Sequence, residues 1–490
     1  MAGRNGREPE ILPQSVGNIR RPNQKPFHRL AQTVEPHVLV VDVIERPFVA
    51  AFGTGKTVIG ACIAALLVQR GHRIVITAST NVAVAQITET ILGVDLAAGM
   101  PLCRFVAETV QYDESVPRTA VDMNEVLKSF ADRFRKVLSD ALLNTCERYR
   151  RGRILVDDHH RNRIPAGRSL TPLEREELLV AERDVSDLME DMVAIMFRWY
   201  CPDILLITTS SLLNTTSAGG IFRDYLGEFD ILLCDEASQV PEPVFAAMLS
   251  RLPQARHIYI GDLHQLEPFA RCSRSTSAAL LGARSMIDVL TRARAVPAAS
   301  LITTFRAHPG LIDLPNQFTN ESLPFICIDV DRVLRRSTTM SRTNESEAEV
   351  CRTIVQRLIQ RGIEPATIGL IAFYRDQHRH LANFARSVGV DLATVDSIQG
   401  REKDVVILLT TRPHFTPETS EFIDDVYRRD VALTRCRHGQ LVLGHQLSLV
   451  AVPVWHKVLT CRQNHGALVD VDMEEYLPAL QEAGEMEAFS

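Results

Sequence analysis

The 490-residue sequence lacks several features that mark whole classes of protein. It has no uninterrupted apolar run of roughly eighteen residues, so no segment is expected to span a membrane. The first residues, MAGRNGREPEILPQS, lack the apolar core of a secretory signal. The ten Cys stand singly, without a C-x-x-C pair, which argues against a disulfide framework or a zinc site. We therefore expect a protein of a reducing compartment, in the cytoplasm or nucleus, with no membrane partner.

Positive charge is not in excess either, since the formal net charge is −6. Two segments depart from this average. Residues 147–168 hold seven Arg against three acidic residues, and residues 470–490 hold seven acidic residues without Lys or Arg. A solvated surface is the simplest interpretation of both segments. Alternatively, the first adds electrostatic affinity for a nucleic acid, and the second masks a basic groove.

What the sequence does contain is an alternation of apolar strands and helical patterns, arranged in two blocks. Such alternation predicts parallel sheets covered by helices on both faces. The first block covers residues 36–298, and long charged segments of helical period interrupt it at about 108–200 as a helical insertion. The second block covers residues 299–450. A flexible N-terminal segment, 1–35, and a C-terminal helix with an acidic tail, 451–490, are expected to flank the two blocks.

Short runs rich in β-branched and other apolar residues are the expected strands. In the first block they are HVLVVDV, RPFVAAF, RIVIT, DILLIT, FDILLCD and HIYIGD. In the second block they are FICIDV, IGLIAF, DLATV, DVVILLT and QLVLGH. Helices are expected at KTVIGACIAALLVQR, NVAVAQITETIL, ESEAEVCRTIVQRLIQRG and RDQHRHLANFARSVG.

Residues 53–57 read GTGKT and lie between an expected strand and an expected helix. Glycines permit a tight turn whose N–H groups point at phosphate oxygens, and the following helix N-terminus adds positive potential. In such a loop Lys56 neutralises the β- and γ-phosphates, and the Thr57 hydroxyl holds Mg²⁺. Ala50 stands where the first Gly of the usual G-x-x-x-x-G-K-[ST] pattern belongs. An ordinary glycine-rich turn is therefore the alternative interpretation.

Acidic and polar residues follow two of the expected strands directly. FDILLCDEASQ places Asp235 and Glu236 at the carboxyl edge of a sheet, where ligands bind in folds of this kind. Asp235 would reach Mg²⁺, and Glu236 would position and activate the water that attacks the γ-phosphate. HIYIGDLHQLEP would bring Asp262 and Gln265 beside the same phosphates. A solvated pair of loop acids is the alternative for the first segment, and a plain turn for the second.

Six segments follow GTGKT in a fixed order: ITASTNVAVAQI, DEASQ, GDLHQLEP, TFRAHP, VDSIQGREKDVVIL and VALTRCR. This order resembles the superfamily 1 helicases, and most closely their Upf-like branch, which includes the helicase of nonsense-mediated decay and senataxin. The resemblance covers about residues 45–445. It implies an α/β fold of two tandem RecA-like P-loop NTPase domains with parallel sheets, a helical insertion in the first domain, and ATP in the cleft between them.

The resemblance also implies a role for each matching residue. The residues carried over are, for ATP, Gly53, Thr54, Gly55, Lys56, Thr57, Phe305, Gly400 and Glu402; for Mg²⁺, Thr57 and Asp235; for catalysis, Glu236, Gln265, Arg306 and Arg435; and for nucleic acid, Ser79, Thr80, Asn81 and Ser397. Phe305 is expected to stack on the base, and Arg306 and Arg435 to reach over from the second domain. For Ser79 and Thr80 a plain loop or helix cap is the alternative.

The sequence departs from the family pattern at the entrance to the phosphate loop. RPF at residues 46–48 is followed by only VAAF before GTGKT, so about three residues are missing relative to the family spacing. The upstream L-N-x-x-Q motif, whose Gln reads adenine in the family, has only Gln24 and Gln32 as candidates, neither in good context. We interpret GTGKT as a phosphate loop with a shortened entrance, which either still binds ATP or has lost it.

Three functions are compatible with these observations. The leading prediction is an ATP-dependent helicase or translocase on single-stranded nucleic acid, with RNA and 5′→3′ polarity implied by the resemblance. The second is an RNA-stimulated ATPase that remodels protein–RNA complexes without processive unwinding. The third is a catalytically inactive module that binds RNA or protein. We expect a monomer with ATP and Mg²⁺ as ligands, single-stranded RNA or DNA as partner, and further protein partners in RNA metabolism.

Overall fold

The computed structural model describes most of the chain between residues 38 and 469. The described residues are 38–42, 54–113, 116–161, 171–263, 265–270, 272, 276–293, 296, 298–300, 325–330, 334–336, 342–398, 401–415, 422–453, 455–456, 458–459 and 468–469. No helix in these ranges is long and apolar enough to cross a membrane.

The first domain is built on a seven-stranded sheet in which every pairing is parallel. The strand order is β3-β4-β2-β5-β6-β1-β7. The strands are β1 (Val38–Asp42), β2 (Ile74–Ala78), β3 (Leu102–Arg104), β4 (Ile204–Thr208), β5 (Ile231–Cys234), β6 (Arg256–Ile260) and β7 (Ala298–Ser300). All side chains of β2, β4 and β5 are buried, which is typical of strands covered on both faces.

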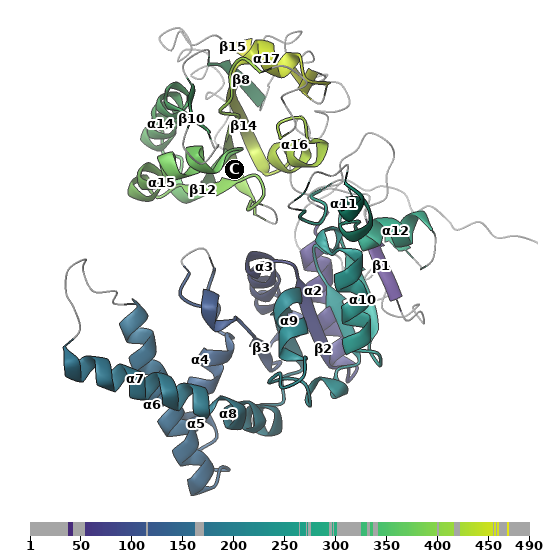
Figure 1. Ribbon diagram of the computed structural model, residues 1–490, viewed down its shortest axis with the longest axis vertical. Coiled ribbons are helices and arrows are strands. Elements are labelled where there is room, and N and C mark those ends of the chain that lie inside the picture. The colour runs from purple at the N-terminus through teal and green to yellow at the C-terminus, as the bar shows by residue number, and fades with distance from the viewer. Residues whose placement is uncertain are drawn as a thin grey trace, which may run out of the picture.

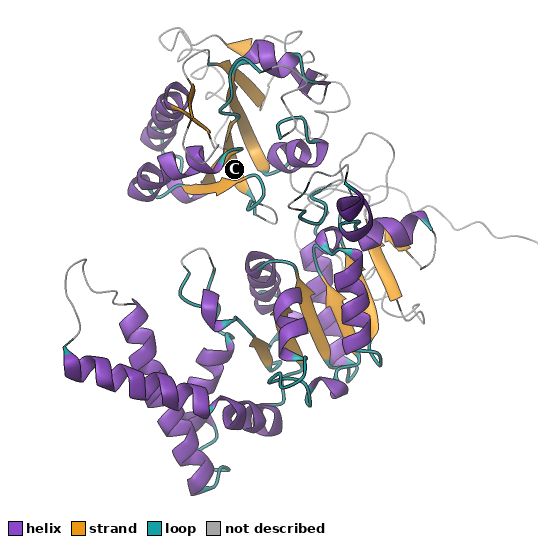
Figure 2. Cartoon of the chain, in the orientation of Figure 1, coloured by secondary structure: helices purple, strands orange, loops and turns teal. Residues whose placement is uncertain are grey.

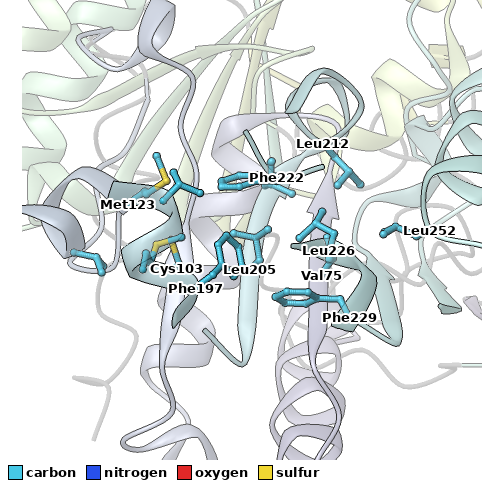
Figure 3. Packing of buried hydrophobic residues seen from close by; sticks show 14 of the residues in the cluster. Val75, Cys103, Met123, Phe197, Leu205, Leu212, Phe222, Leu226, Phe229 and Leu252 are labelled. Atoms are coloured by element: carbon cyan, nitrogen blue, oxygen red, sulfur yellow. The ribbon is translucent and has the colours of Figure 1, made fainter. Parts of the chain in front are cut away.

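Helices cover both faces of this sheet, as Figure 1 shows. They are α2 (Lys56–Gln69), α3 (Asn81–Leu92), α9 (Thr209–Thr215), α10 (Glu242–Arg251), α11 (Ser277–Gly282) and α12 (Met286–Arg292). One core contains the apolar residues of α2 and α3. The other core, drawn in Figure 3, joins Val75 and Leu205 of the sheet to Phe222 and Phe229. The two cores fix the carboxyl edge of the sheet, where the loops after β2, β5 and β6 meet.

The helical insertion lies between β3 and β4 and projects away from the sheet (Figures 1 and 2). It consists of α4 (Met123–Lys128), α5 (Phe130–Arg133), α6 (Asp140–Arg161), α7 (Pro172–Asp187) and α8 (Met189–Ile195). Helices α6 and α7 cross closely at Gly152, where an added Cβ would lie 3.2 Å from the Ala181 carbonyl oxygen. Met123 and Phe197 belong to the same core as the sheet, which ties the base of the insertion to the first domain.

The second domain is built on a six-stranded parallel sheet of order β12-β11-β13-β14-β8-β15. Its strands are β8 (Phe325–Asp329), β11 (Ile368–Ala372), β12 (Asp391–Thr394), β13 (Lys403–Leu409), β14 (Cys436–Gly444) and β15 (Leu468–Val469). Its helices are α14 (Glu345–Gln360), α15 (Arg375–Val388), α16 (Val426–Leu433) and α17 (Gln446–Val450). A separate antiparallel pair joins β9 (Leu334–Arg336) to β10 (Arg342–Asn344).

The architecture confirms the predicted α/β fold of two tandem RecA-like domains. The expected helices at 81–92 and 345–362 form as α3 and α14, of which α14 ends two residues earlier, and most expected strands lie within two residues of the observed ones. The prediction RPFVAAF falls outside the described residues. The helical insertion expected at about 108–200 forms as several helices, α4 to α8. Strand β15 lies in a region where only a helix and an acidic tail were expected, because a two-residue strand leaves no periodic pattern.

One buried acid makes the stability of the second domain depend on pH. Glu347, in the first turn of α14, is fully buried, and this burial raises the pKa of its carboxyl group to about 8. One carboxyl oxygen accepts the Thr411 N–H at 2.9 Å, and the other has no hydrogen-bond partner among the described residues. Since the usual pKa of this group is 4.5, the folded chain binds the extra proton, and this stabilisation is lost as pH rises from 4.5 to about 8.

We therefore expect Glu347→Gln, which keeps a neutral group there, to reduce the fall in melting temperature on going from about pH 6 to 8.5. Glu349→Gln is the matched control, because Glu349 is exposed on the same helix. Thermal unfolding followed by circular dichroism at both pH values gives the comparison. An unchanged pH dependence in Glu347→Gln would show that this carboxyl group is ionised in the folded protein.

Candidate functional site

The start of α2 forms the first side of the candidate site. Gly55 has φ 76° and ψ 27°, a left-handed conformation that glycine adopts without strain, and Lys56 follows as the first helical residue. Within residues 54–69 no side chain caps this helix start, and its first turn holds no acid. Thr54 is buried, and its hydroxyl has no hydrogen-bond partner in the described part of the chain. Backbone N–H groups in this setting attract an anion, and the Thr54 hydroxyl can donate to one.

The acid pair after β5 forms the second side. Asp235 is buried, with one carboxylate oxygen accepting the Thr57 hydroxyl at 3.2 Å and the other accepting the Glu236 N–H at 2.9 Å. Burial, and then the neighbouring Glu236 charge, raise the pKa of Asp235. Glu236 has φ 51° and ψ 39°, which is uncommon for a residue with a Cβ and typical of functional sites. A cation here would relieve the repulsion between these two carboxyl groups.

The loop after β6 forms the third side. The Asp262 carboxylate accepts hydrogen bonds from Lys56 Nζ at 3.2 Å and from Gln265 Nε2 at 2.6 Å, through the same oxygen. The approach of this loop to the acid pair depends on Gly261. A Cβ there would lie 2.4 Å from Ile287 Cδ1 and 2.9 Å from the Ser238 nitrogen, closer than packed atoms come. Glycine thus lets the loops after β5 and β6 lie together.

Arg435 brings the second domain into contact with this loop. Its side chain is 1% exposed, and Nη2 donates to Gln265 Oε1 at 2.8 Å. Nε donates to the Val431 carbonyl oxygen at 2.9 Å, which fixes the guanidinium group to α16. A continuous set of polar contacts therefore runs from Lys56 through Asp262 and Gln265 to Arg435. This set spans both domains.

The arrangement can bind a polyanion together with a hard cation. Two cationic side chains, Lys56 and Arg435, lie at the ends of the polar contacts, and the start of α2 adds backbone donors. Oxygen donors from Thr57 and Asp235 suit Mg²⁺, which in such sites takes one or two protein ligands and completes its shell with phosphates and water. Among the described residues no group of three or more His, Cys, Asp or Glu could hold a metal ion by itself.

Several predicted site residues cannot be placed in this geometry. Gly53, Phe305, Arg306 and Gly400 lie outside the described residues, so their roles stay predictions. Glu402 is half-buried, and its carboxylate accepts Arg437 Nε at 3.2 Å, a contact within the second domain. Its expected contact with ribose also stays a prediction.

The expected nucleic-acid residues lie at the carboxyl edges of the two sheets. Ser79, Thr80 and Asn81 follow β2, and Ser397 lies in the turn after β12. Thr80 Oγ1 accepts the Ala83 N–H at 3.2 Å and caps α3, which is the structural alternative for this residue. Ser397 Oγ accepts the Thr394 N–H at 2.9 Å. Both hydroxyl groups thus hold local turns.

The arginine-rich segment 147–168 is largely neutralised within the helical insertion. Arg148 pairs with Asp184, and Arg150 pairs with Asp132 at 2.8 Å. Arg153 is buried and pairs with Asp157 at 3.0 Å. These pairs favour a structural role over a free basic surface for the described part of this segment. The acidic tail 470–490 lies outside the described residues.

Sequence reasoning missed the residues beside Gln265 that contact the second domain. Leu266 packs against the core of that domain, and burial of the phenol, followed by the Glu267 carboxylate, raises the pKa of Tyr427 in α16. The segment HQLEP marks the position of Leu266 and Glu267, but no signal in the sequence identifies their partners. Such contacts depend on how the two domains meet.

Comparisons with known proteins agree with this geometry. Two family models match, each described as an AAA domain, one over residues 46–271 and the other over residues 313–447. The Arabidopsis thaliana protein "Regulator of nonsense transcripts 1 homolog" is 25% identical over 455 residues, which are 85% of this chain and 32% of that protein. The Schizosaccharomyces pombe "ATP-dependent helicase upf1" is 28% identical over 279 residues, 50% of this chain and 29% of that protein. The chain thus spans about a third or less of the length of these relatives.

A solved structure of arterivirus nonstructural protein 10, a helicase, with DNA matches at a TM-score of 0.35 and 14% identity, over 83% of this chain and 60% of that one. The two parallel sheets, the start of α2 and the acid pair after β5 define a P-loop NTPase with tandem RecA-like domains. Within that class, the two domain matches and the relatives show that the chain is similar to the Upf-like branch of the superfamily 1 helicases.

Proposed function

We propose that this chain is an ATP-dependent helicase or translocase that moves 5′→3′ on single-stranded nucleic acid, with RNA as the substrate. The observation that carries the proposal is the set of polar contacts from Lys56 through Asp262 and Gln265 to Arg435. It joins the two domains at the place where family members bind ATP. A site shared by two domains lets nucleotide binding close the cleft and hydrolysis reopen it, which is the motion that translocation requires.

Each side chain then has a task toward the triphosphate. Lys56 and the start of α2 neutralise the β- and γ-phosphates, and Thr57 with Asp235 holds Mg²⁺. Mg²⁺ held by these residues would supply positive charge that offsets the charge developing on the phosphate oxygens. Glu236 orients the attacking water and accepts its proton. Gln265 contacts the transferred phosphoryl group from the first domain, and Arg435 contacts it from the second domain.

Both cationic side chains of the site have hydrogen-bond partners within the protein. A buried ammonium or guanidinium group without a partner is costly. Here Asp262 accepts Lys56, and Gln265 accepts Arg435, so that both cations are hydrogen-bonded in advance. Phosphate oxygens would take over these two positions. The site therefore holds two hydrogen-bonded cations in position for an anion.

Hydrolysis of ATP by the purified chain, with and without single-stranded RNA, tests the proposal most simply. Lys56→Ala provides the reference, because it removes the cation at the start of α2. We expect hydrolysis that RNA stimulates, and near-background hydrolysis in Lys56→Ala. A strand-separation assay on a duplex with a 5′ overhang then distinguishes translocation with unwinding from remodelling without unwinding. Equal rates for the wild type and Lys56→Ala would refute the proposal and favour an inactive binding module.

A further inference from the structure

One oxygen of Asp262 connects the phosphate loop with the residue that contacts the second domain. Asp262 Oδ2 accepts Lys56 Nζ at 3.2 Å and Gln265 Nε2 at 2.6 Å. Gln265 Oε1 in turn accepts Arg435 Nη2 at 2.8 Å. The proposed chemistry gives a task to Lys56, Gln265 and Arg435. It gives none to Asp262, although this carboxylate joins the other three.

The ion pair between Lys56 and Asp262 lies where charges interact strongly. The side chain of Asp262 is 2% exposed, and that of Lys56 is 10% exposed. Water and salt screen such a buried pair poorly. A second anion that approaches the Lys56 ammonium group is therefore repelled by the carboxylate that already binds it. Since the phosphates of a nucleotide are anions of this kind, Asp262 and a phosphate group compete for one cation.

The backbone holds the Asp262 carboxylate in place, whereas the lysine side chain can turn. Asp262 follows Gly261, where a Cβ would lie 2.4 Å from Ile287 Cδ1, so the loop after β6 lies tightly against α12. The Gln265 N–H donates to the Asp262 carbonyl oxygen at 3.1 Å, which closes the turn. Lys56 has a flexible four-carbon stem with three rotatable donors. A phosphate group that binds Lys56 therefore draws the ammonium group away from Asp262, and the carboxylate keeps its hydrogen bond with Gln265.

The same carboxylate decides how the Gln265 amide is oriented. An ionised carboxylate only accepts hydrogen bonds, a guanidinium group only donates them, and an amide does both at different atoms. With Asp262 on one side and Arg435 on the other, both contacts form only when Nε2 faces the carboxylate and Oε1 faces the guanidinium group, as they do here. Asp262 thus presents the amide oxygen of Gln265 to the second domain.

We propose that Asp262 is a positioning residue with two opposite effects on the nucleotide site. Its charge competes with the nucleotide phosphates for Lys56, which weakens nucleotide binding. Its oxygen orients Gln265 toward Arg435, which supports hydrolysis. This inference rests on the proposed function, because it takes a nucleotide as the ligand of Lys56. The two effects act on different constants, the first on the affinity for nucleotide and the second on kcat.

Two substitutions at Asp262 separate these effects. Asp262→Asn removes the charge and keeps an oxygen that can accept Gln265 Nε2, whereas Asp262→Ala removes both. In calorimetric titration with Mg²⁺ and a non-hydrolysable ATP analogue, we expect both variants to bind about tenfold more tightly than the wild type, since a hydrogen bond to a charged group typically contributes that much. We expect kcat to fall about tenfold in Asp262→Ala and by less in Asp262→Asn. Asp224→Asn, which removes an exposed carboxylate from the same domain, is the matched control and should change neither constant.

The direction of the change in affinity decides whether Asp262 competes with the nucleotide. Equal or weaker binding in both variants would show that the carboxylate supports Lys56, and the competition would be overturned. Equal kcat in Asp262→Asn and Asp262→Ala would overturn the orientation of Gln265. The titration needs no hydrolysis, so a wild-type chain that binds the analogue but hydrolyses no ATP refutes the proposed function together with the orienting role, while the affinities still decide the competition. No binding in the wild type or in either variant would overturn the whole inference.

Discussion

Replacing Arg435 by Ala should lower the kcat for ATP hydrolysis by about a thousandfold, the effect typical of an arginine that stabilises a transferred phosphoryl group. The guanidinium group is buried and reaches Gln265 from the other domain, so its removal takes a cation directly from the place where the two domains meet. Because the charge on the phosphoryl oxygens increases in the transition state, we expect a much smaller change in nucleotide affinity. Steady-state hydrolysis at saturating RNA measures the first quantity, and titration with a non-hydrolysable ATP analogue measures the second.

Two further variants make the Arg435 result specific. Arg435→Lys keeps the charge but cannot donate from Nε and Nη2 together, so it should recover only part of the lost rate. Arg386→Ala removes an exposed arginine from α15 of the same domain and should have no effect on kcat. Thermal unfolding of each variant shows whether the domain still folds. Equal kcat for Arg435→Ala and Arg386→Ala would remove Arg435 from the nucleotide site.

Glu236→Gln should abolish hydrolysis while it preserves nucleotide binding. The Gln amide has nearly the same shape as the carboxylate but cannot accept a proton from the attacking water, and loss of a general base costs about a hundredfold to ten-thousandfold in rate. Removing one charge from the acid pair also relieves the repulsion that raises the pKa of Asp235. We therefore expect binding of Mg²⁺ and the ATP analogue to be as tight as in the wild type, or tighter.

Glu242→Gln is the matched control for Glu236→Gln. Glu242 begins α10 a few residues beyond the acid pair and pairs with the exposed Arg284, outside the set of polar contacts at the seam. Its variant should hydrolyse ATP at the wild-type rate. Retained hydrolysis in Glu236→Gln would contradict the assignment of Glu236 as the base and leave the water to another group.

Much of the fold could be predicted from the sequence because its strands are buried on both faces. Runs such as DILLIT and FDILLCD are apolar throughout and end in polar residues, so both their extent and their carboxyl ends are visible. Strand β3 was not predicted, because its three residues, LCR, carry no period that distinguishes a strand. Its place in the sheet is set by pairing with β4.

The candidate site, too, could be predicted from the sequence only in part. Lys56, Asp235 and Gln265 each follow a recognisable strand or loop pattern, so the site residues that the first domain contributes could be predicted from local sequence. The two hydrogen bonds that Asp262 accepts from Lys56 and Gln265 could not be predicted. One oxygen accepts both donors, which are more than two hundred positions apart in the sequence, and this arrangement depends on the packing of β6. The packing of Leu266 against the core of the second domain depends on how two separately folded domains meet, which leaves no local pattern.

A structure determined with Mg²⁺ and a non-hydrolysable ATP analogue tests most directly the claim that one site is shared by both domains. We predict that the phosphates lie between Lys56 Nζ and the Arg435 guanidinium group, with Asp235 on the metal side and Glu236 facing the γ-phosphate. An analogue bound elsewhere, or bound by Lys56 with Arg435 turned toward a separate surface, would contradict the account.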